Sequence, residues 1–296
     1  MAIVPVDNYL TYRIGVLLLI ALMYAVFDVF NRRNVPTVFA YATLAIGFIF
    51  TFGYIQLMAI GESLLIGFAI LGIGYIFYRA GQVGAADVIE LAAISLIMPI
   101  QPAPIYLGVQ QYGLPFIISL FVGAGIIALL MIPIYYIPRA KRLLKRRMEQ
   151  LVTRRDILRG ALICVAYLAF MTFLYVEINA SMLGIVVVAA ITIGSVATVT
   201  FERPITDSMV EYISVKDFED GDIIAFNLMK KKDISAYKKA IRGFDRLITN
   251  RIIDRMRAKH IRAKFPVYRQ AMPLALPILL GAIISLLVGN VLLLII

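Results

Sequence analysis

The residues on which many enzyme sites depend are nearly absent from this chain. Among its 296 residues there are one cysteine, one histidine and no tryptophan. Because Cys164 has no second cysteine to pair with, an intrachain disulfide is impossible, and we expect no cysteine-based metal site. With His260 as the single histidine, we expect neither a Ser-His or Cys-His triad nor a histidine-rich zinc site. Carboxylates are left to carry any chemistry, and we expect no metal and no cofactor.

Charged side chains are scarce as well. They make up 16% of the residues, against 61% hydrophobic residues, and the mean hydropathy is +0.89. A globular protein of this length would need more polar side chains to cover its surface, so the composition predicts a protein that crosses a membrane several times. The net charge of +11 does not indicate a nucleic-acid-binding protein, because the basic residues stand in short blocks between apolar runs.

Apolar segments long enough to cross a bilayer as helices recur along the chain. We count eight, so the predicted fold is an all-α polytopic membrane protein with about eight transmembrane helices and a small cytosolic α+β domain. We expect a turn at Gly61–Ser63 between the second and third spans, and Pro138 as the end of the fifth. The fourth span begins at about residue 86, and the prolines that follow either shorten or break it. The other expected spans are about residues 12–30, 37–58, 64–78, 114–137, 161–176, 183–201 and 272–296.

These segments predict five parts. Residues 1–138 form a membrane core of five spans, and residues 139–159 form a basic cytoplasmic segment, either an amphipathic helix on the membrane surface or a solvated loop. Residues 160–201 form an additional transmembrane hairpin, residues 202–270 the cytosolic domain, and residues 271–296 a C-terminal span. In the cytosolic domain we expect short strands at 212–215 and 222–227, and then a helical stripe. The stripe consists of Ile241, Phe244, Ile248, Ile252 and Met256.

The basic residues predict the orientation in the membrane. With eight spans and both termini outside, every Lys and Arg except Arg13 falls in a cytoplasmic loop or domain, as the positive-inside rule requires. No basic residue precedes Arg13 and no small-residue cleavage motif follows the first apolar run, so we expect a retained span and not a cleaved signal peptide.

Two aspartates then lie at the same depth, just beneath the cytoplasmic surface. Asp28 ends the first span, and Asp87 begins the fourth. Apolar spans do not need carboxylates for packing, so each is a candidate functional residue. Two adjacent carboxylates cannot both ionise cheaply, which suits a pair in which one activates water while the other protonates a carbonyl. The structural alternative is that Asp28 pairs with Arg32 and Asp87 with Arg79.

The residues around both aspartates resemble a known family. Phe27-Asp28, followed by Arg32 and Val35-Pro36, resembles the first-aspartate motif of type IV prepilin peptidases, and Gly84-Ala85-Ala86-Asp87 resembles their GxGD motif. The overall form is similar to the archaeal branch that processes preflagellins (archaellins). The resemblance covers the first five spans and, more loosely, the region after Glu211.

The resemblance implies an aspartic endopeptidase of the cell membrane. Such enzymes remove the short basic leader of preflagellin or prepilin-like precursors at the cytoplasmic face before filament assembly, so the expected partners are these precursors and membrane lipids. The implied catalytic residues are Asp28 and Asp87, and the residues placed to position the substrate are Gly84, Ala85, Ala86 and Glu90.

Two positions depart from the family pattern. Ala86 stands where the motif has glycine, and its methyl group slightly limits how closely a substrate backbone approaches. Glu90 stands one helical turn after Asp87, where many relatives have lysine. It either acts on Asp87 or a basic substrate residue, or forms a salt bridge with Arg79 or a basic loop. The tetracysteine zinc domain and any methyltransferase signature of bacterial relatives are absent, so we expect peptidase activity only.

Two other classes of protein stay open. An intramembrane protease of the presenilin or signal-peptide-peptidase type also uses paired aspartates, but it would show Tyr-Asp, an intact glycine motif and Pro-Ala-Leu near the end, where this chain has Pro273-Leu-Ala-Leu-Pro277. A cation-coupled transporter would use Asp28 and Asp87 as ion ligands, although such ligands normally lie near the bilayer midplane between inverted repeats.

Overall fold

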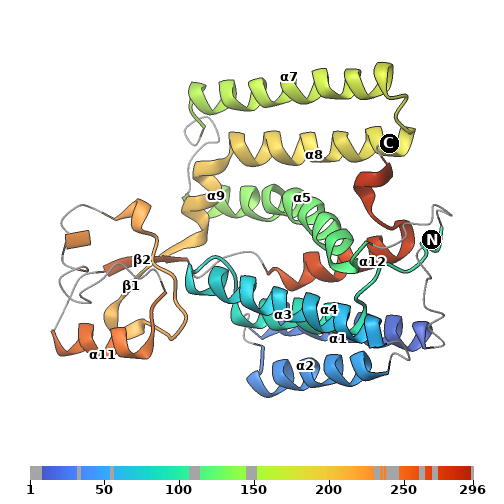
Figure 1. Cartoon of the computed structure of the whole chain (residues 1–296). Helices are drawn as coiled ribbons and strands as arrows, with labels where there is room; N and C mark the ends of the chain where they lie inside the picture. Colours follow the sequence, from blue (N-terminus) through green and yellow to red (C-terminus); the bar gives the residue numbers. More distant parts are fainter. Residues whose placement is uncertain are drawn as a thin grey trace.

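A computed structural model shows a helical bundle with a small domain at one end (Figure 1). Helices account for 77% of the described residues. The structure describes residues 9–31, 35–53, 57–106, 114–144, 152–229, 234–235, 237, 247–259, 264–268 and 273–294. The helices are α1 (Leu10–Phe30), α2 (Thr37–Phe52), α3 (Leu57–Arg79), α4 (Ala85–Ile97), α5 (Phe116–Leu144), α7 (Arg154–Glu177), α8 (Met182–Thr200), α9 (Glu202–Met209), α11 (Asn250–Ala258) and α12 (Ala275–Val288).

Five helices in the described part of the chain are long and apolar enough to cross a membrane. They are α1, α3, α5, α7 and α8. The expectation of eight spans is therefore not supported. Helices α2 and α12 are apolar but have only 16 and 14 residues, and α4 has 13. At 1.5 Å per residue these three are each about 20–24 Å long, which is shorter than a hydrocarbon core of about 30 Å.

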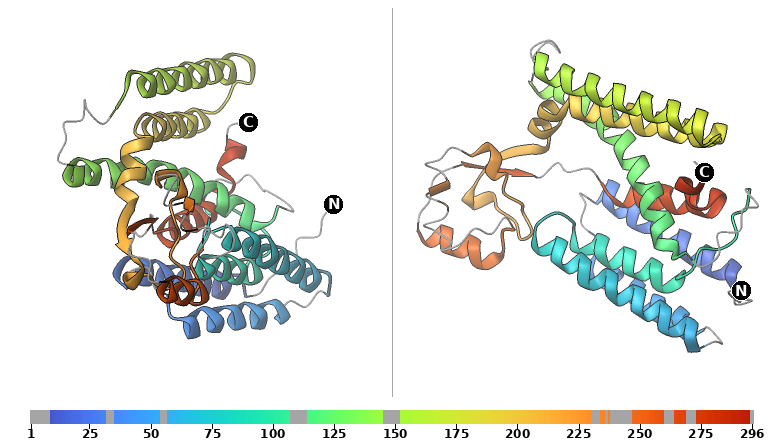
Figure 2. Two further views of the ribbon diagram at one scale, coloured as in Figure 1. Left: turned by 90° about the vertical axis from the view of Figure 1, so that its left-hand side faces the viewer. Right: turned by 45° about the horizontal axis from the view of Figure 1, so that its top comes forward.

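The helices pack in successive layers, which Figures 1 and 2 show from three directions. Helix α7 packs on α8, α8 on α5, α5 on α12, and α12 on α1. Below α12, helices α1, α2 and α3 surround α4. The turn between α3 and α4 lies beside the small domain, and we call this end of the bundle the domain end.

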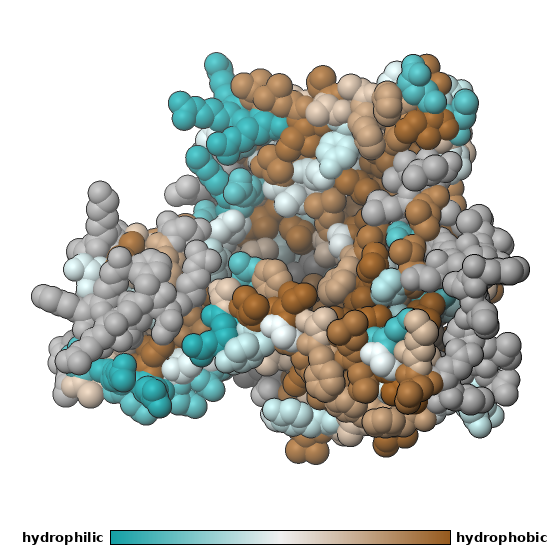
Figure 3. Space-filling view, in the orientation of Figure 1, coloured by the Kyte–Doolittle hydropathy of each residue, from teal (hydrophilic) through white to brown (hydrophobic). Residues whose placement is uncertain are grey.

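The face of the bundle that Figure 3 shows is largely apolar, and hydrophilic residues gather near the domain end, at the start of α7 and where α7 and α8 join. Many of the outward side chains are large and apolar. On α7, Leu162, Val165 and Leu168 are all more than half exposed. Exposed apolar side chains along a whole helix are typical of contact with lipid, so this surface supports the membrane character that the composition predicts.

Three of the expected helix boundaries are wrong. Helix α3 runs through Gly61–Ser63, so the chain turns before Leu57 and not at that tripeptide. Helix α5 continues past Pro138, and α7 starts at Arg154, ahead of the expected start near residue 161. The basic segment 139–159 is thus divided between two helices, and its residues 145–151 lie outside the described part. A helix in apolar surroundings tolerates proline because its other backbone groups have no better partners than one another.

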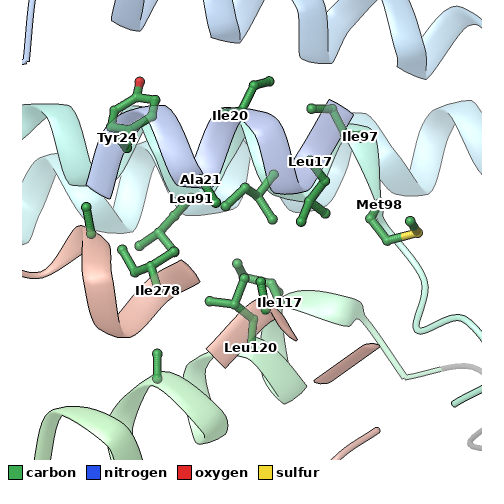
Figure 4. Close-up of a cluster of buried hydrophobic side chains, with 14 of the residues drawn as sticks. Leu17, Ile20, Ala21, Tyr24, Leu91, Ile97, Met98, Ile117, Leu120 and Ile278 are labelled. Atoms are coloured by element: carbon green, nitrogen blue, oxygen red, sulfur yellow. The ribbon is translucent and has the colours of Figure 1, made fainter. Parts of the chain in front are cut away.

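Helix α4 is the most buried helix of the bundle, with every residue from Glu90 to Ile97 inside the protein. Its neighbours approach closely because they present glycines. A Cβ atom on Gly47 of α2 would lie 3.0 Å from the Leu96 side chain, and one on Gly67 of α3 would lie 2.6 Å from it. Helix α4 ends before Pro99, which confirms the shorter of the two forms expected for this segment. Apolar side chains of α4 pack with those of α1, α5 and α12 in one cluster (Figure 4).

Arg13 joins α1 to the far ends of α2 and α4. The side chain is completely buried, and its guanidinium donates to the carbonyl oxygens of Ile97 at 2.9 Å and Phe50 at 2.8 Å. It also lies over the Phe50 ring, 5.6 Å from the ring centre. Carbonyls in the last turn of a helix have no partner within the helix, and they carry the negative end of the helix dipole. The positive charge of Arg13 is stabilised by two such ends.

Helices α5 and α12 cross at a pair of glycines. A Cβ atom on Gly281 would lie 2.5 Å from the backbone nitrogen of Ala124, and one on Gly123 would lie 3.1 Å from the Gly281 carbonyl oxygen. Neither site has room for a methyl group without a shift of backbone. This crossing fixes the position of α12, and therefore of its first residues.

The small domain, residues 210–268, has its own apolar core. Strands β1 (Val210–Ser214) and β2 (Lys264–Tyr268) pair antiparallel, with Val210 opposite Tyr268. The strand expected near residues 212–215 is present as β1, but it pairs with β2 and not with residues 222–227. Residues 222–227 contribute only isolated bridges and a short 3₁₀ turn. From the expected stripe, Ile248, Ile252 and Met256 are buried in this core, whereas Ile241 and Phe244 lie outside the described residues.

We expect Arg13→Met to destabilise the bundle, because it leaves two buried carbonyls without their charged donor. Hydrogen bonds to charged groups contribute about 1.5–3 kcal/mol each, so the loss of both is expected to lower the unfolding free energy in detergent by about 3–6 kcal/mol. Arg155→Met, at an exposed position of α7, is the matched control and should change stability little. Equal unfolding midpoints for the two variants would show that Arg13 does not hold the helix ends.

We expect Gly281→Ala to force α12 away from α5 and to lower the unfolding free energy by about 1–3 kcal/mol, the usual effect of overpacking. The control is Gly125→Ala on α5, where an added Cβ meets nothing within 4 Å. This control should be neutral or slightly stabilising, since alanine favours a helix more than glycine does. A Gly281→Ala protein as stable as the Gly125→Ala protein would contradict the crossing described here.

Candidate active site

Asp28 lies in the last turn of α1, at the domain end of the bundle, and its side chain is 9% exposed. Its Oδ2 accepts a hydrogen bond of 3.1 Å from the backbone N–H of Ala275, the first residue of α12. The first N–H groups of a helix have no partner within the helix and carry the positive end of its dipole. A carboxylate at this point satisfies one of them, and α12 in return stabilises the negative charge of Asp28.

Asp87 lies in the first turn of α4, and it is half-buried. Its Oδ2 accepts a hydrogen bond of 3.2 Å from the backbone N–H of Gly84, the residue that precedes the helix. A Cβ atom on Gly84 would lie 2.8 Å from the same oxygen. Glycine at this position therefore lets the backbone approach the carboxylate. Gly81, with φ of 68°, ends α3 and turns the chain toward this site.

The fold brings the two aspartates together from separate helices. The carboxyl groups of Asp28 and Asp87 are close enough for their negative charges to repel each other, and the carboxyl group of Glu90 repels both. Asp28 reaches the site at the end of a helix and Asp87 at the start of another. One helix runs toward the domain end and the other away from it, so both carboxyl groups lie at the same end of the bundle.

The alanines between Gly84 and Asp87 have different surroundings. Ala85 is exposed at the start of α4, whereas Ala86 is partly buried and packs against the apolar cluster of the bundle. The methyl group of Ala86 is thus turned at least partly into the protein. The expectation that it limits the approach of a substrate backbone is not tested by this packing and stays a prediction.

Glu90 follows Asp87 by one helical turn and is completely buried, with 0% of the side chain exposed. Neither of its carboxyl oxygens has a hydrogen-bond partner among the described residues. The expected salt bridge to Arg79 is absent from the described structure, since Arg79 is exposed at the end of α3 and forms no ion pair there with Glu90 or Asp87. The other expected pairing, between Asp28 and Arg32, involves a residue outside the described part.

Tyr24 and Thr43 form a polar contact that sequence analysis missed. The Tyr24 hydroxyl lies 3.0 Å from Thr43 Oγ1, and Thr43 Oγ1 donates to the Ala40 carbonyl at 2.7 Å. Because threonine has one hydroxyl hydrogen, Tyr24 is the donor to Thr43. Tyr24 lies one turn before Asp28 and within electrostatic range of both Glu90 and Asp87. Tyr24 precedes Asp28 by four residues, and this helical spacing is the sequence signal that places its side chain near the site.

The contact between Asp28 and Ala275 was also missed, and no sequence signal pointed to it. The sequence of Pro273–Pro277 differs from a presenilin-type motif and gives no sign that this segment begins the helix whose first N–H meets Asp28. Within the described residues, no group of three or more His, Cys, Asp or Glu side chains is arranged to hold a metal ion.

Comparison with models of known protein families, with curated proteins and with solved structures finds no match to this chain. The chemical interpretation of the site therefore depends on its residues and geometry.

We expect Asp28→Asn and Asp28→Ala to differ in stability. The side-chain oxygen of asparagine can still accept the Ala275 N–H, so Asp28→Asn should unfold within about 0.5 kcal/mol of the wild type. Alanine leaves that N–H without its acceptor and should cost about 1 kcal/mol, as capping substitutions usually do. Thermal unfolding in detergent measures both. If the two variants were equally stable, the contact with α12 would contribute nothing.

Proposed function

We propose that this protein is a membrane-embedded aspartic endopeptidase that removes the short basic leader of preflagellin or prepilin-like precursors before filament assembly. The observation that carries the proposal is the placement of Asp28 in the last turn of α1 and Asp87 in the first turn of α4, within electrostatic range of each other in an apolar helical bundle. Paired carboxyl groups in a largely water-excluded site are suited to peptide hydrolysis without a metal or a nucleophilic side chain.

The chemistry follows from sharing one proton between the two carboxyl groups. The ionised carboxylate removes a proton from water, whose oxygen attacks the carbonyl carbon of the scissile peptide. The protonated carboxyl group donates its proton to the carbonyl oxygen, which gives a neutral tetrahedral diol. The first group then gives its proton to the amide nitrogen, the C–N bond breaks, and one of the two diol protons returns to the second group while the other stays on the new carboxyl group. The backbone N–H groups of Ala275 and Gly84 hold one oxygen of each aspartate during these steps.

The position of the pair supports the choice of substrate. The domain end carries the basic start of α7 and the small domain, whose helix α11 has Arg255 and Arg257 in its last turn, so in the proposed orientation it faces the cytoplasm and both termini face outside. A precursor with a basic leader followed by an apolar helix would keep its leader in the cytoplasm and its helix in the bilayer. Its scissile bond, at the boundary of the two, would then lie at the depth of Asp28 and Asp87.

A presenilin-like protease is the second candidate, and one observation favours it. The segment Pro273–Pro277 near the end of the chain meets the first aspartate through Ala275, and the corresponding motif expected for that class is also near the end. The two candidates share the aspartate pair and differ in substrate. A presenilin-like enzyme would cut within a transmembrane helix that lacks a basic leader.

We expect the wild-type protein in membranes to cleave a precursor with a basic leader, and Asp28→Asn and Asp87→Asn each to lower the rate by at least about a hundredfold. Proton transfer by a positioned group contributes a factor of this size, and neither variant keeps the shared proton. Glu62→Gln, an exposed acid on α3, is the matched control and should retain full activity. Immunoblotting of precursor and product measures the rate, and protease protection verifies insertion of each variant.

Each failure of this assay has a specific meaning. Cleavage at the wild-type rate by either aspartate variant would overturn the carboxyl pair. Cleavage of a leaderless transmembrane helix, with no cleavage at the leader, would select the presenilin-like alternative. If neither substrate were cut and the aspartates were instead required for cation uptake into proteoliposomes, the protein would be a transporter.

A further inference from the structure

Glu90 is a buried acid that the proposed reaction does not use. It is fully buried on α4, both of its carboxyl oxygens lack hydrogen-bond partners in the described part of the chain, and it lies next to the aspartate pair. Burying a polar group without a hydrogen bond has a cost in stability, because the group loses its bonds to water and gains none in the protein. Nothing in the described structure offsets this cost, so a compensating gain has to come from another state of the protein.

In the proposed orientation, the depth of Glu90 argues against a contact between its carboxyl group and a basic residue of the leader. Helix α4 starts at the domain end, so Glu90 lies about 4.5 Å further into the bundle than Asp87 at 1.5 Å per residue. A basic leader would lie on the opposite side of the aspartates, at the domain end. Glu90 therefore does not meet a basic residue of the leader, and it faces the apolar part of a bound precursor.

Protonation makes Glu90 a matched partner for a peptide group. An ionised carboxylate with no partner, beside two other carboxyl groups, is far less stable than the neutral acid. The neutral acid has one O–H donor and one carbonyl acceptor, which complement the C=O and N–H of a peptide unit. The neighbouring hydroxyls of Tyr24 and Thr43 already bond to each other. Glu90 is thus the described side chain at this depth with both hydrogen-bonding functions open.

A transmembrane precursor needs such a partner. To be cut, its helix has to unwind near the scissile bond, and each unwound residue leaves an N–H and a C=O without partners in surroundings that exclude water. An extended chain advances about 3.3 Å per residue. A depth difference of about 4.5 Å therefore places Glu90 beside the first or second residue beyond the scissile bond, on the apolar side.

We propose that Glu90 is a substrate-binding residue whose neutral carboxyl group bonds to the unwound backbone of the precursor just beyond the scissile bond. This proposal rests on the peptidase function proposed above, and it names a contact within that site. The side chain is closed off in the present structure, so the contact forms when the substrate enters between Asp28 and Asp87. Substrate binding then gives the Glu90 carboxyl group the two hydrogen bonds that it lacks among the described residues.

The test compares Glu90→Leu with Glu90→Gln in the membrane cleavage assay and in thermal unfolding. Leucine fills the site but has no polar atoms, so kcat/KM should fall by about thirtyfold while the unfolding midpoint rises by a few degrees. Glutamine keeps one donor and one acceptor, so it should retain at least about a third of kcat/KM. Ser95→Ala is the matched control, because Ser95 is also fully buried on α4 but bonds within its own helix to Ala92. Its activity should not change.

Three results would overturn the proposal. Full activity of Glu90→Leu would show that no substrate contact exists. Equal loss in Glu90→Leu and Glu90→Gln would show that ionisation, and not hydrogen bonding, is required. A lower unfolding midpoint in Glu90→Leu would show a structural role. A failure of the peptidase function itself gives different results. In that case the wild-type protein leaves the precursor intact, or the Asp28→Asn variant cuts it, and either result would overturn both proposals.

Discussion

The hydrogen bonds of Arg13 are the interaction on which the arrangement of the bundle depends most directly. They join the first helix to the far ends of α2 and α4. Helix α4 has few polar contacts with its neighbours, and apolar packing alone leaves a helix free to slide along its axis. The charged hydrogen bond from Arg13 to Ile97 fixes the axial position of α4 relative to α1, and the second bond, to Phe50, does the same for α2. With that position fixed, Asp28 and Asp87 meet at the opposite ends of the same two helices.

Helix α12 completes the site from the other end of the sequence. Its position is set by the glycine crossing with α5, where the backbones are in direct contact. That crossing brings the first N–H of α12 to Asp28. The site is therefore assembled from three helices, each placed by a contact distant from the site. A substitution at such a contact is expected to act on the geometry of the aspartates without touching them.

One physical rule applies to all buried polar groups of the bundle: each needs a hydrogen-bond partner, and in this bundle the ends of helices supply several of them. Arg13 and Asp28 use the ends of helices, where backbone groups lack partners, and each charge is offset by the opposite end of a helix dipole. Ser63 and Thr51 share the Leu96 carbonyl, so they too are satisfied. Glu90 departs from this rule among the described residues beside the aspartates, which is why it carries the further proposal.

Composition and hydropathy were sufficient to predict a helical membrane protein, because burial of apolar side chains in a bilayer depends on residue type and little on context. The glycine turn and Asp87 at the start of a helix were also readable, since they depend on neighbouring residues alone. The helix ends near Gly61 and Pro138 were predicted wrongly, because rules derived for water fail where the backbone has no solvent to bond. Only the tertiary structure decided that Ala275 meets Asp28 and that Glu90 is buried without a hydrogen-bond partner among the described residues. Such contacts join residues far apart in the chain, and they depend on how the helices pack.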